Sequence, residues 1–232
     1  MVKLEELRKK VKEKILLKGF TGTGKTYTAV KIAEVLLERG EKVVAVDTED
    51  GMGKDLLKLP EELLEHLTLH ICGNYNEFRK ALDTLKGGDN KLVIVDSLSH
   101  LKDYARREAR LRLLRDGKFY MGEKTVKIDN PDTYTLRGYQ YALPNIWEDY
   151  FLGDLVHCGA NIVATLMVDP LTDFTDYDGA FDIVLQMYYI DEEEKRKWKA
   201  KILKNRGRSD ETVGKGLNNP PEQLTKLFKK EG

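Results

Sequence analysis

An apolar run leads directly into a glycine-rich loop and then into a helix-like pattern. Residues Ile15-Leu16-Leu17 precede the sequence GFTGTGKT, which occupies positions 19–26. Glycines at these spacings let the backbone turn its N–H groups inward around an anion, and the helix that follows adds the positive end of its dipole. A strand, a phosphate-binding loop and a helix are therefore expected in this order, which commits the chain to an α/β fold.

The loop predicts a site for a nucleoside triphosphate, with ATP and Mg²⁺ as the implied ligands. Lys25 supplies a point charge for the terminal phosphates, and the Thr26 hydroxyl is suited to hold the metal ion. The predicted nucleotide-binding residues are Gly19, Phe20, Thr21, Gly22, Thr23, Gly24, Lys25, Thr26 and Tyr27.

The rest of the chain alternates short apolar runs with helical patterns, which is typical of a parallel sheet built from βαβ units. The predicted strands cover residues 15–18, 43–47, 67–71, 92–96, 161–168 and 183–190. The predicted helices cover residues 25–39, 76–86, 98–114, 140–158 and 222–229. Residues 115–138 interrupt the alternation, and the segment 119–124 within them predicts an inserted hairpin.

The length of 232 residues fits one α/β domain, predicted over residues 15–232 with an insertion at 115–138. Residues 1–14 are expected to form either a helical arm or a disordered leader. The 39 basic and 39 acidic side chains cancel, so the net charge does not single out nucleic acid as a partner. A charged fraction of 34% with only three glutamines is typical of proteins from thermophiles.

Cysteine usage and hydropathy bear on the compartment. Cys72 and Cys158 both fall in apolar stretches, which predicts core positions in a reducing environment. No apolar run approaches the roughly 20 residues that span a bilayer. A cytoplasmic protein without membrane contact is expected.

Two strand ends carry carboxylates suited to ATP chemistry. The run Leu92-Val93-Ile94-Val95 ends at Asp96, and parallel strands bring such an acid to the same sheet edge as the phosphate loop. Asp96 is predicted to act on Mg²⁺, and it could also cap the helix that follows. Ser97, not a glutamate, comes next, so the catalytic carboxylate must come from elsewhere. The strand at 43–47 offers Glu49 at its exit, where it can orient the attacking water.

The GFTGTGKT loop, the VDTEDG segment at 46–51 and LVIVDSLSHL at 92–101 together resemble the RecA-like ATPases, which include the bacterial recombinase, archaeal RadA and KaiC-type proteins. The resemblance implies a RecA-like fold, with a mainly parallel sheet between helices and a C-terminal antiparallel strand or hairpin. It also implies that Glu49 is the catalytic residue, with Asp47 and Asp50 as weaker candidates or turn-forming residues.

Two later segments extend the resemblance. Residues 160–165 are similar to the family's strand that ends in a sensor of the γ-phosphate, which gives this role to Thr165. Recombinases usually carry Asn-Gln after that threonine, whereas Leu166-Met167 stand here. This departure puts coupling to DNA in doubt.

Lys204-Asn205-Arg206 match the K-x-R finger that KaiC-like and replicative-helicase relatives insert into the ATP site of the neighbouring subunit. The resemblance therefore implies catalytic roles for Lys204 and Arg206 in a homo-oligomer, either a ring or a filament. The alternative is a solvated basic strand.

The partner class stays open. Residues 102–127 carry nine basic and four acidic side chains, with Phe119 and Tyr120 among them, a pattern suited to single-stranded DNA, although a solvated helix face would look similar. Residues 169–182 carry five aspartates and no basic residue, which would repel phosphates. The leading hypothesis is an oligomeric ATPase in DNA recombination, repair or replication. The alternatives are a KaiC-like regulatory or scaffold ATPase acting on protein partners, and a P-loop small-molecule kinase.

Overall fold

The computed structural model describes residues 12–85, 89–116, 119–121, 124–126, 142–168, 175–192, 195–206 and 213–229. Its strands are β1 (Lys14–Gly19), β2 (Val43–Asp47), β3 (Leu67–Ile71), β4 (Leu92–Asp96), β5 (Phe119–Met121), β6 (Lys124–Val126), β7 (Asn161–Met167), β8 (Ile183–Glu192), β9 (Lys195–Asn205) and β10 (Gly216–Asn218). Its helices are α2 (Lys25–Leu37), α3 (Gly53–Leu56), α4 (Glu61–Leu64), α5 (Tyr75–Leu85), α6 (Ser99–Asp116), α7 (Ala142–Val156) and α8 (Pro220–Lys229), with a 3₁₀ turn, η2, at Asp176–Ala180.

Eight of the strands form one sheet in the order β10-β9-β8-β1-β7-β4-β2-β3. The six strands from β8 to β3 run parallel to their neighbours, while β9 and β10 are antiparallel. The fold is therefore α/β with a mainly parallel sheet and antiparallel C-terminal strands, as the sequence predicted.

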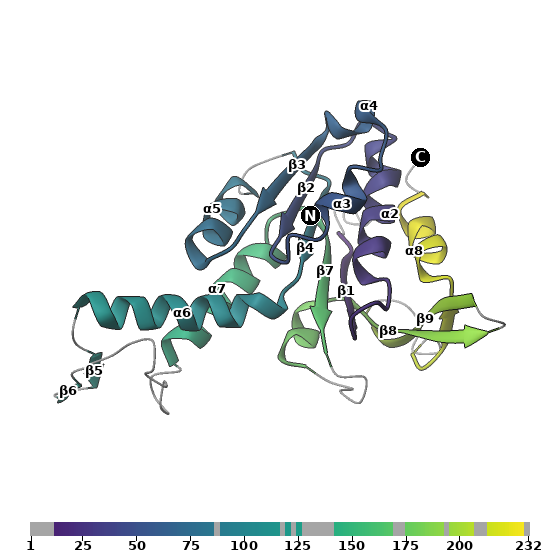
Figure 1. Cartoon of the computed structure of the whole chain (residues 1–232). Helices are drawn as coiled ribbons and strands as arrows, with labels where there is room; N and C mark the ends of the chain where they lie inside the picture. The colour runs from purple at the N-terminus through teal and green to yellow at the C-terminus, as the bar shows by residue number, and fades with distance from the viewer. Residues whose placement is uncertain are drawn as a thin grey trace, which may run out of the picture.

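The sheet lies between two layers of helices (Figure 1). Side chains of α2 and α8, such as Ile32 and Phe228, pack on one face. Side chains of α5, α6 and α7, such as Phe78, Leu101 and Phe151, pack on the other. The central strands are buried on both faces, which is why β4 and β7 are apolar without alternation.

All six predicted strands and all five predicted helices are present; the strands at 43–47, 67–71 and 92–96 have the predicted bounds, and the ends of the other elements differ by at most two residues. The predicted hairpin is also present as the antiparallel pair β5–β6, and Figure 1 shows it beyond the far end of α6 from the sheet. The prediction for residues 1–14 falls mostly outside the described residues, except that Lys14 already belongs to β1. Among the described helices, none combines the length and apolar character needed to cross a bilayer.

Candidate nucleotide-binding site

The glycine-rich loop joins the carboxyl end of β1 to the first turn of α2. Gly22 and Gly24 adopt φ values of 81° and 83°, in the left-handed region that favours glycine. Space also restricts Gly24, because a methyl group there would lie 3.1 Å from Cδ2 of Trp198. The loop is therefore shaped both by its backbone and by the β9 side chain packed against it.

Lys25 folds back onto the loop. Its Nζ donates hydrogen bonds to the carbonyl oxygens of Gly19 and Phe20, both at 2.9 Å. Burial lowers the pKa of Lys25, and the nearby negative charges of Asp96 and Glu49 oppose this shift. The ammonium group thus lies among the loop carbonyls, close to both acids, and could exchange these carbonyls for phosphate oxygens.

Asp96, at the end of β4, is 2% exposed and accepts hydrogen bonds from the hydroxyls of Thr165 and Thr26. Burial raises the pKa of Asp96, these two hydrogen bonds lower it, and the charges of Glu49 and Asp47 raise it further. A cation beside Asp96 would relieve the cost of its buried charge.

The Thr26 hydroxyl and the Asp96 carboxylate are a pair of oxygen ligands suited to Mg²⁺, which is usually held by one or two protein groups together with phosphate oxygens. In the part of the chain that the structure describes, no group of three or more His, Cys, Asp or Glu side chains could hold a metal on its own. Magnesium would therefore bind here together with the nucleotide.

The three acids after β2 have different surroundings. Asp47 is fully buried, and its carboxylate accepts hydrogen bonds from the backbone N–H groups of Glu49 and Met52, both at 2.9 Å. It therefore forms the turn and fixes the position of Glu49. Glu49 is exposed and close enough to shift the pKa of both Lys25 and Asp96. Asp50 is also exposed, but neither of these shifts involves it. The geometry favours Glu49 over Asp47 as the group that meets water.

Sequence reasoning missed Thr48, which connects the ends of β2 and β4. Its hydroxyl donates to the carbonyl oxygen of Ser97 at 2.9 Å and accepts from the Ser97 N–H at 2.8 Å. His100 and Tyr104 of α6 also contact Thr48. Strands β2 and β4 are neighbours in the sheet, with Asp47 opposite Asp96, and this pairing brings Thr48 next to Ser97. The sequence around Thr48 alone does not reveal which strand pairs with β2.

The structure does not bring Lys204 and Arg206 to the loop of their own chain. Lys204 lies opposite Val184, near the amino end of β8, and donates to the carbonyl oxygen of Asp178 at 2.7 Å. Arg206 lies 3.6 Å from the Asp182 carboxylate, and its side chain is 61% exposed. Within one chain, the side chains of Lys204 and Arg206 therefore lie at the end of the sheet opposite the phosphate loop.

The acidic segment is less negative than its sequence indicates. Asp178 is buried in an ion pair with Lys18 at 2.7 Å, directly before the phosphate loop, and Asp182 pairs with Arg206. Asp176, in contrast, is 96% exposed. The remaining aspartates of the segment lie outside the described residues.

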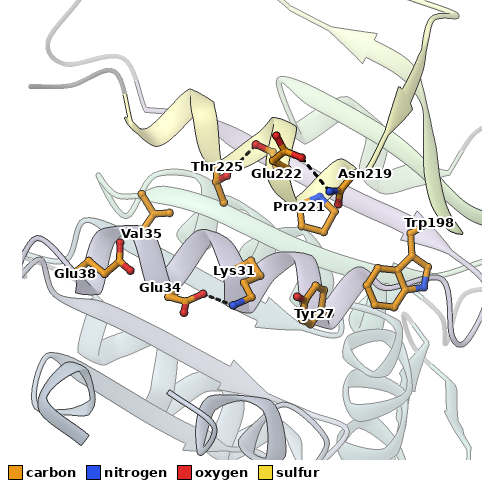
Figure 2. A pocket seen from close by; sticks show the side chains of 10 residues that line it. All are labelled: Tyr27, Lys31, Glu34, Val35, Glu38, Trp198, Asn219, Pro221, Glu222 and Thr225. Atoms are coloured by element: carbon orange, nitrogen blue, oxygen red, sulfur yellow. Dashed lines mark hydrogen bonds and ion pairs between the residues drawn. The ribbon is translucent and has the colours of Figure 1, made fainter. Parts of the chain in front are cut away.

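A cavity of about 360 Å³ opens beside the loop, between α2, Trp198 and the start of α8 (Figure 2). Tyr27 and Trp198 line it with their ring centroids 5.0 Å apart. Asn219, Pro221 and Thr225 line the α8 side. An aromatic wall with polar groups opposite is a common arrangement for a planar ligand.

Residues 1–116, half of the chain, match the family model described as "Type III restriction enzyme, res subunit". No curated protein matches the chain. Among solved structures, the fold is similar to the KaiC-like protein PH0186 from the hyperthermophilic archaeon Pyrococcus horikoshii OT3, with a TM-score of 0.56 and 17% identity over 90% of this chain and 87% of that one. At this identity the likeness shows the fold alone. The chain therefore belongs to the family that the matching model describes, and its fold and glycine-rich loop are those of the RecA-like P-loop ATPases.

Proposed function

We propose that this protein binds MgATP at the β1–α2 loop and hydrolyses it to ADP and phosphate. The supporting observation is the meeting of Lys25, Thr26, Asp96 and Glu49 at the carboxyl edge of the sheet. Together with the backbone N–H groups of a glycine-rich loop, a cation, two metal ligands and a carboxylate open to water are what phosphoryl transfer to water requires.

The residues have distinct roles in this reaction. The loop N–H groups and Lys25 hold the phosphates and stabilise the charge that develops on them. Thr26 and Asp96 would hold Mg²⁺, which supplies further positive charge to the phosphate oxygens. Glu49 orients the attacking water and accepts its proton. Thr165 fixes the Asp96 carboxylate through its hydroxyl.

The nucleoside would occupy the cavity lined by Tyr27 and Trp198, since this cavity opens beside the first turn of α2. A P-loop small-molecule kinase is the weakest alternative, because a kinase has no use for a water-orienting carboxylate at the position of Glu49.

A comparison of Lys25→Ala with Lys58→Ala tests the role of the loop. Lys58 lies outside the loop and the cavity, and its side chain is 74% exposed and pairs with Asp55. Phosphate release from MgATP should fall about 100-fold or more in Lys25→Ala and stay unchanged in Lys58→Ala. Equal release by Lys25→Ala and the wild-type chain would remove the loop from the mechanism.

We further propose that the ATPase acts on DNA in recombination, repair or replication, with single-stranded DNA bound along residues 102–127. On α6, Leu101, Ala105 and Ala109 face the core while Arg107 is exposed. A KaiC-like role on protein partners is the second candidate, and the exposed Asp176 near α6 favours it.

Titration of labelled single- and double-stranded oligonucleotides, with and without ATP and across salt concentrations, separates these two roles. If α6 binds DNA, Arg107→Gln combined with Arg110→Gln should weaken binding and lower the salt dependence by about two phosphate contacts. Lys58→Gln, in a segment that packs on the opposite face of the sheet, is the control. If the wild-type chain bound no oligonucleotide in a salt-dependent way, the DNA role would be rejected and the role on protein partners would remain.

A further inference from the structure

Arg196 of β9 lies beside the phosphate loop of its own chain. A methyl group at Gly22 would lie 3.7 Å from Nη1 of Arg196. Trp198, two residues further along the strand, lies on the same face and packs against Gly24. One face of β9 therefore covers the loop from Gly22 to Gly24.

Neighbours on β8 hold the guanidinium group in this position. Its Cζ lies 4.1 Å from the ring centroid of Tyr189, and its Nε lies 3.8 Å from the Asp191 carboxylate. The Arg196 side chain nevertheless remains 53% exposed. Stacking on Tyr189 restricts the guanidinium while leaving donors open to an anion.

We propose that Arg196 binds the phosphates of the nucleotide held by its own subunit. This inference rests on the proposed function and adds a residue to that site. The loop N–H groups and Lys25 would hold the phosphates from within the loop, and Arg196 would reach them from β9 past Gly22. A guanidinium fork can donate two hydrogen bonds to phosphate oxygens, and this contact would replace the weak pair with Asp191.

This role is distinct from that of Lys204 and Arg206. Those two side chains lie at the opposite end of β9, on carbonyl groups of the segment around η2. Arg196 needs no second subunit to reach the loop, so its contribution should be present in a monomer.

Lys197 provides a matched control for Arg196. The two side chains have the same charge and almost the same exposure, 53% and 54%, but adjacent strand residues point to opposite faces. Lys197 pairs with Glu192 on the face away from the loop. If positive charge on β9 attracted the nucleotide without a specific contact, removing the charge of Arg196 or of Lys197 would therefore weaken binding equally.

The test measures equilibrium binding of MgATP and MgADP to the full chain by calorimetry, with a thermal melt of each variant. Arg196→Gln should raise both dissociation constants about tenfold, because a hydrogen bond to a charged group is lost. Arg196→Lys, which keeps the charge but not the fork, should lie between Arg196→Gln and the wild-type chain. Lys197→Gln should bind like the wild-type chain.

Several outcomes would overturn the proposal. Wild-type affinity in Arg196→Gln would do so while leaving the proposed ATPase function intact. Equal losses in Arg196→Gln and Lys197→Gln would show a general charge effect. If the wild-type chain bound neither nucleotide, the proposed function itself would fail, and this inference with it.

Discussion

The buried carboxylate of Asp96 lowers the stability of the fold at neutral pH but is suited to bind a cation. Burial raises the pKa of Asp96, so its carboxyl group binds a proton more tightly in the folded chain than in the unfolded chain. The stabilisation from Asp96 is therefore complete only below its unfolded-state pKa and is lost as the pH rises through its folded-state pKa. At neutral pH, the ionised carboxylate opposes folding until a cation neutralises it.

Asp96→Asn should consequently raise the free energy of unfolding at neutral pH, on the order of 1 kcal/mol, while abolishing the magnesium dependence of nucleotide binding. The gain should shrink as the pH falls and the wild-type carboxyl becomes neutral. Urea titrations from acidic to neutral pH measure this difference, with the exposed Asp50→Asn as control. A less stable Asp96→Asn chain at neutral pH would contradict the account.

At the scale of elements, the sequence predicted those whose signal is local. The buried strands β4 and β7 consist mostly of apolar residues, and α2 follows a loop whose glycines have the spacing of a phosphate-binding motif. The one-turn helices α3 and α4 were not predicted, because four residues are too few to show a helical period.

The candidate site divides in the same way. Lys25, Thr26 and Asp96 could be predicted because each follows from a motif and its strand. Arg196 could not, since its position depends on the long β8–β9 pairing, in which Asp191 lies opposite Arg196. The different roles of Glu49 and Asp47 also could not be predicted, because they depend on the turn in which the Asp47 carboxylate accepts hydrogen bonds from backbone N–H groups.

At the scale of the whole molecule, the strand order places β1 between β8 and β7, so the loop lies at the centre of the sheet edge. Lys204 and Arg206 lie at the opposite end of β9, and we propose that they act on the loop of a neighbouring subunit. In the phosphate-release assay, mixtures of Lys25→Ala with Arg206→Ala should then recover activity that neither variant has alone. Verified hybrids without recovery would rule out this arrangement.

The central claim is that Glu49 drives hydrolysis of an ATP molecule held by the glycine-rich loop. The most direct measurement compares MgATP binding and single-turnover cleavage in Glu49→Gln and in its exposed neighbour variant Asp50→Asn. Glu49→Gln should bind MgATP as tightly as the wild-type chain and cleave it about 100-fold or more slowly, whereas Asp50→Asn should cleave normally. Normal cleavage by Glu49→Gln would contradict the account.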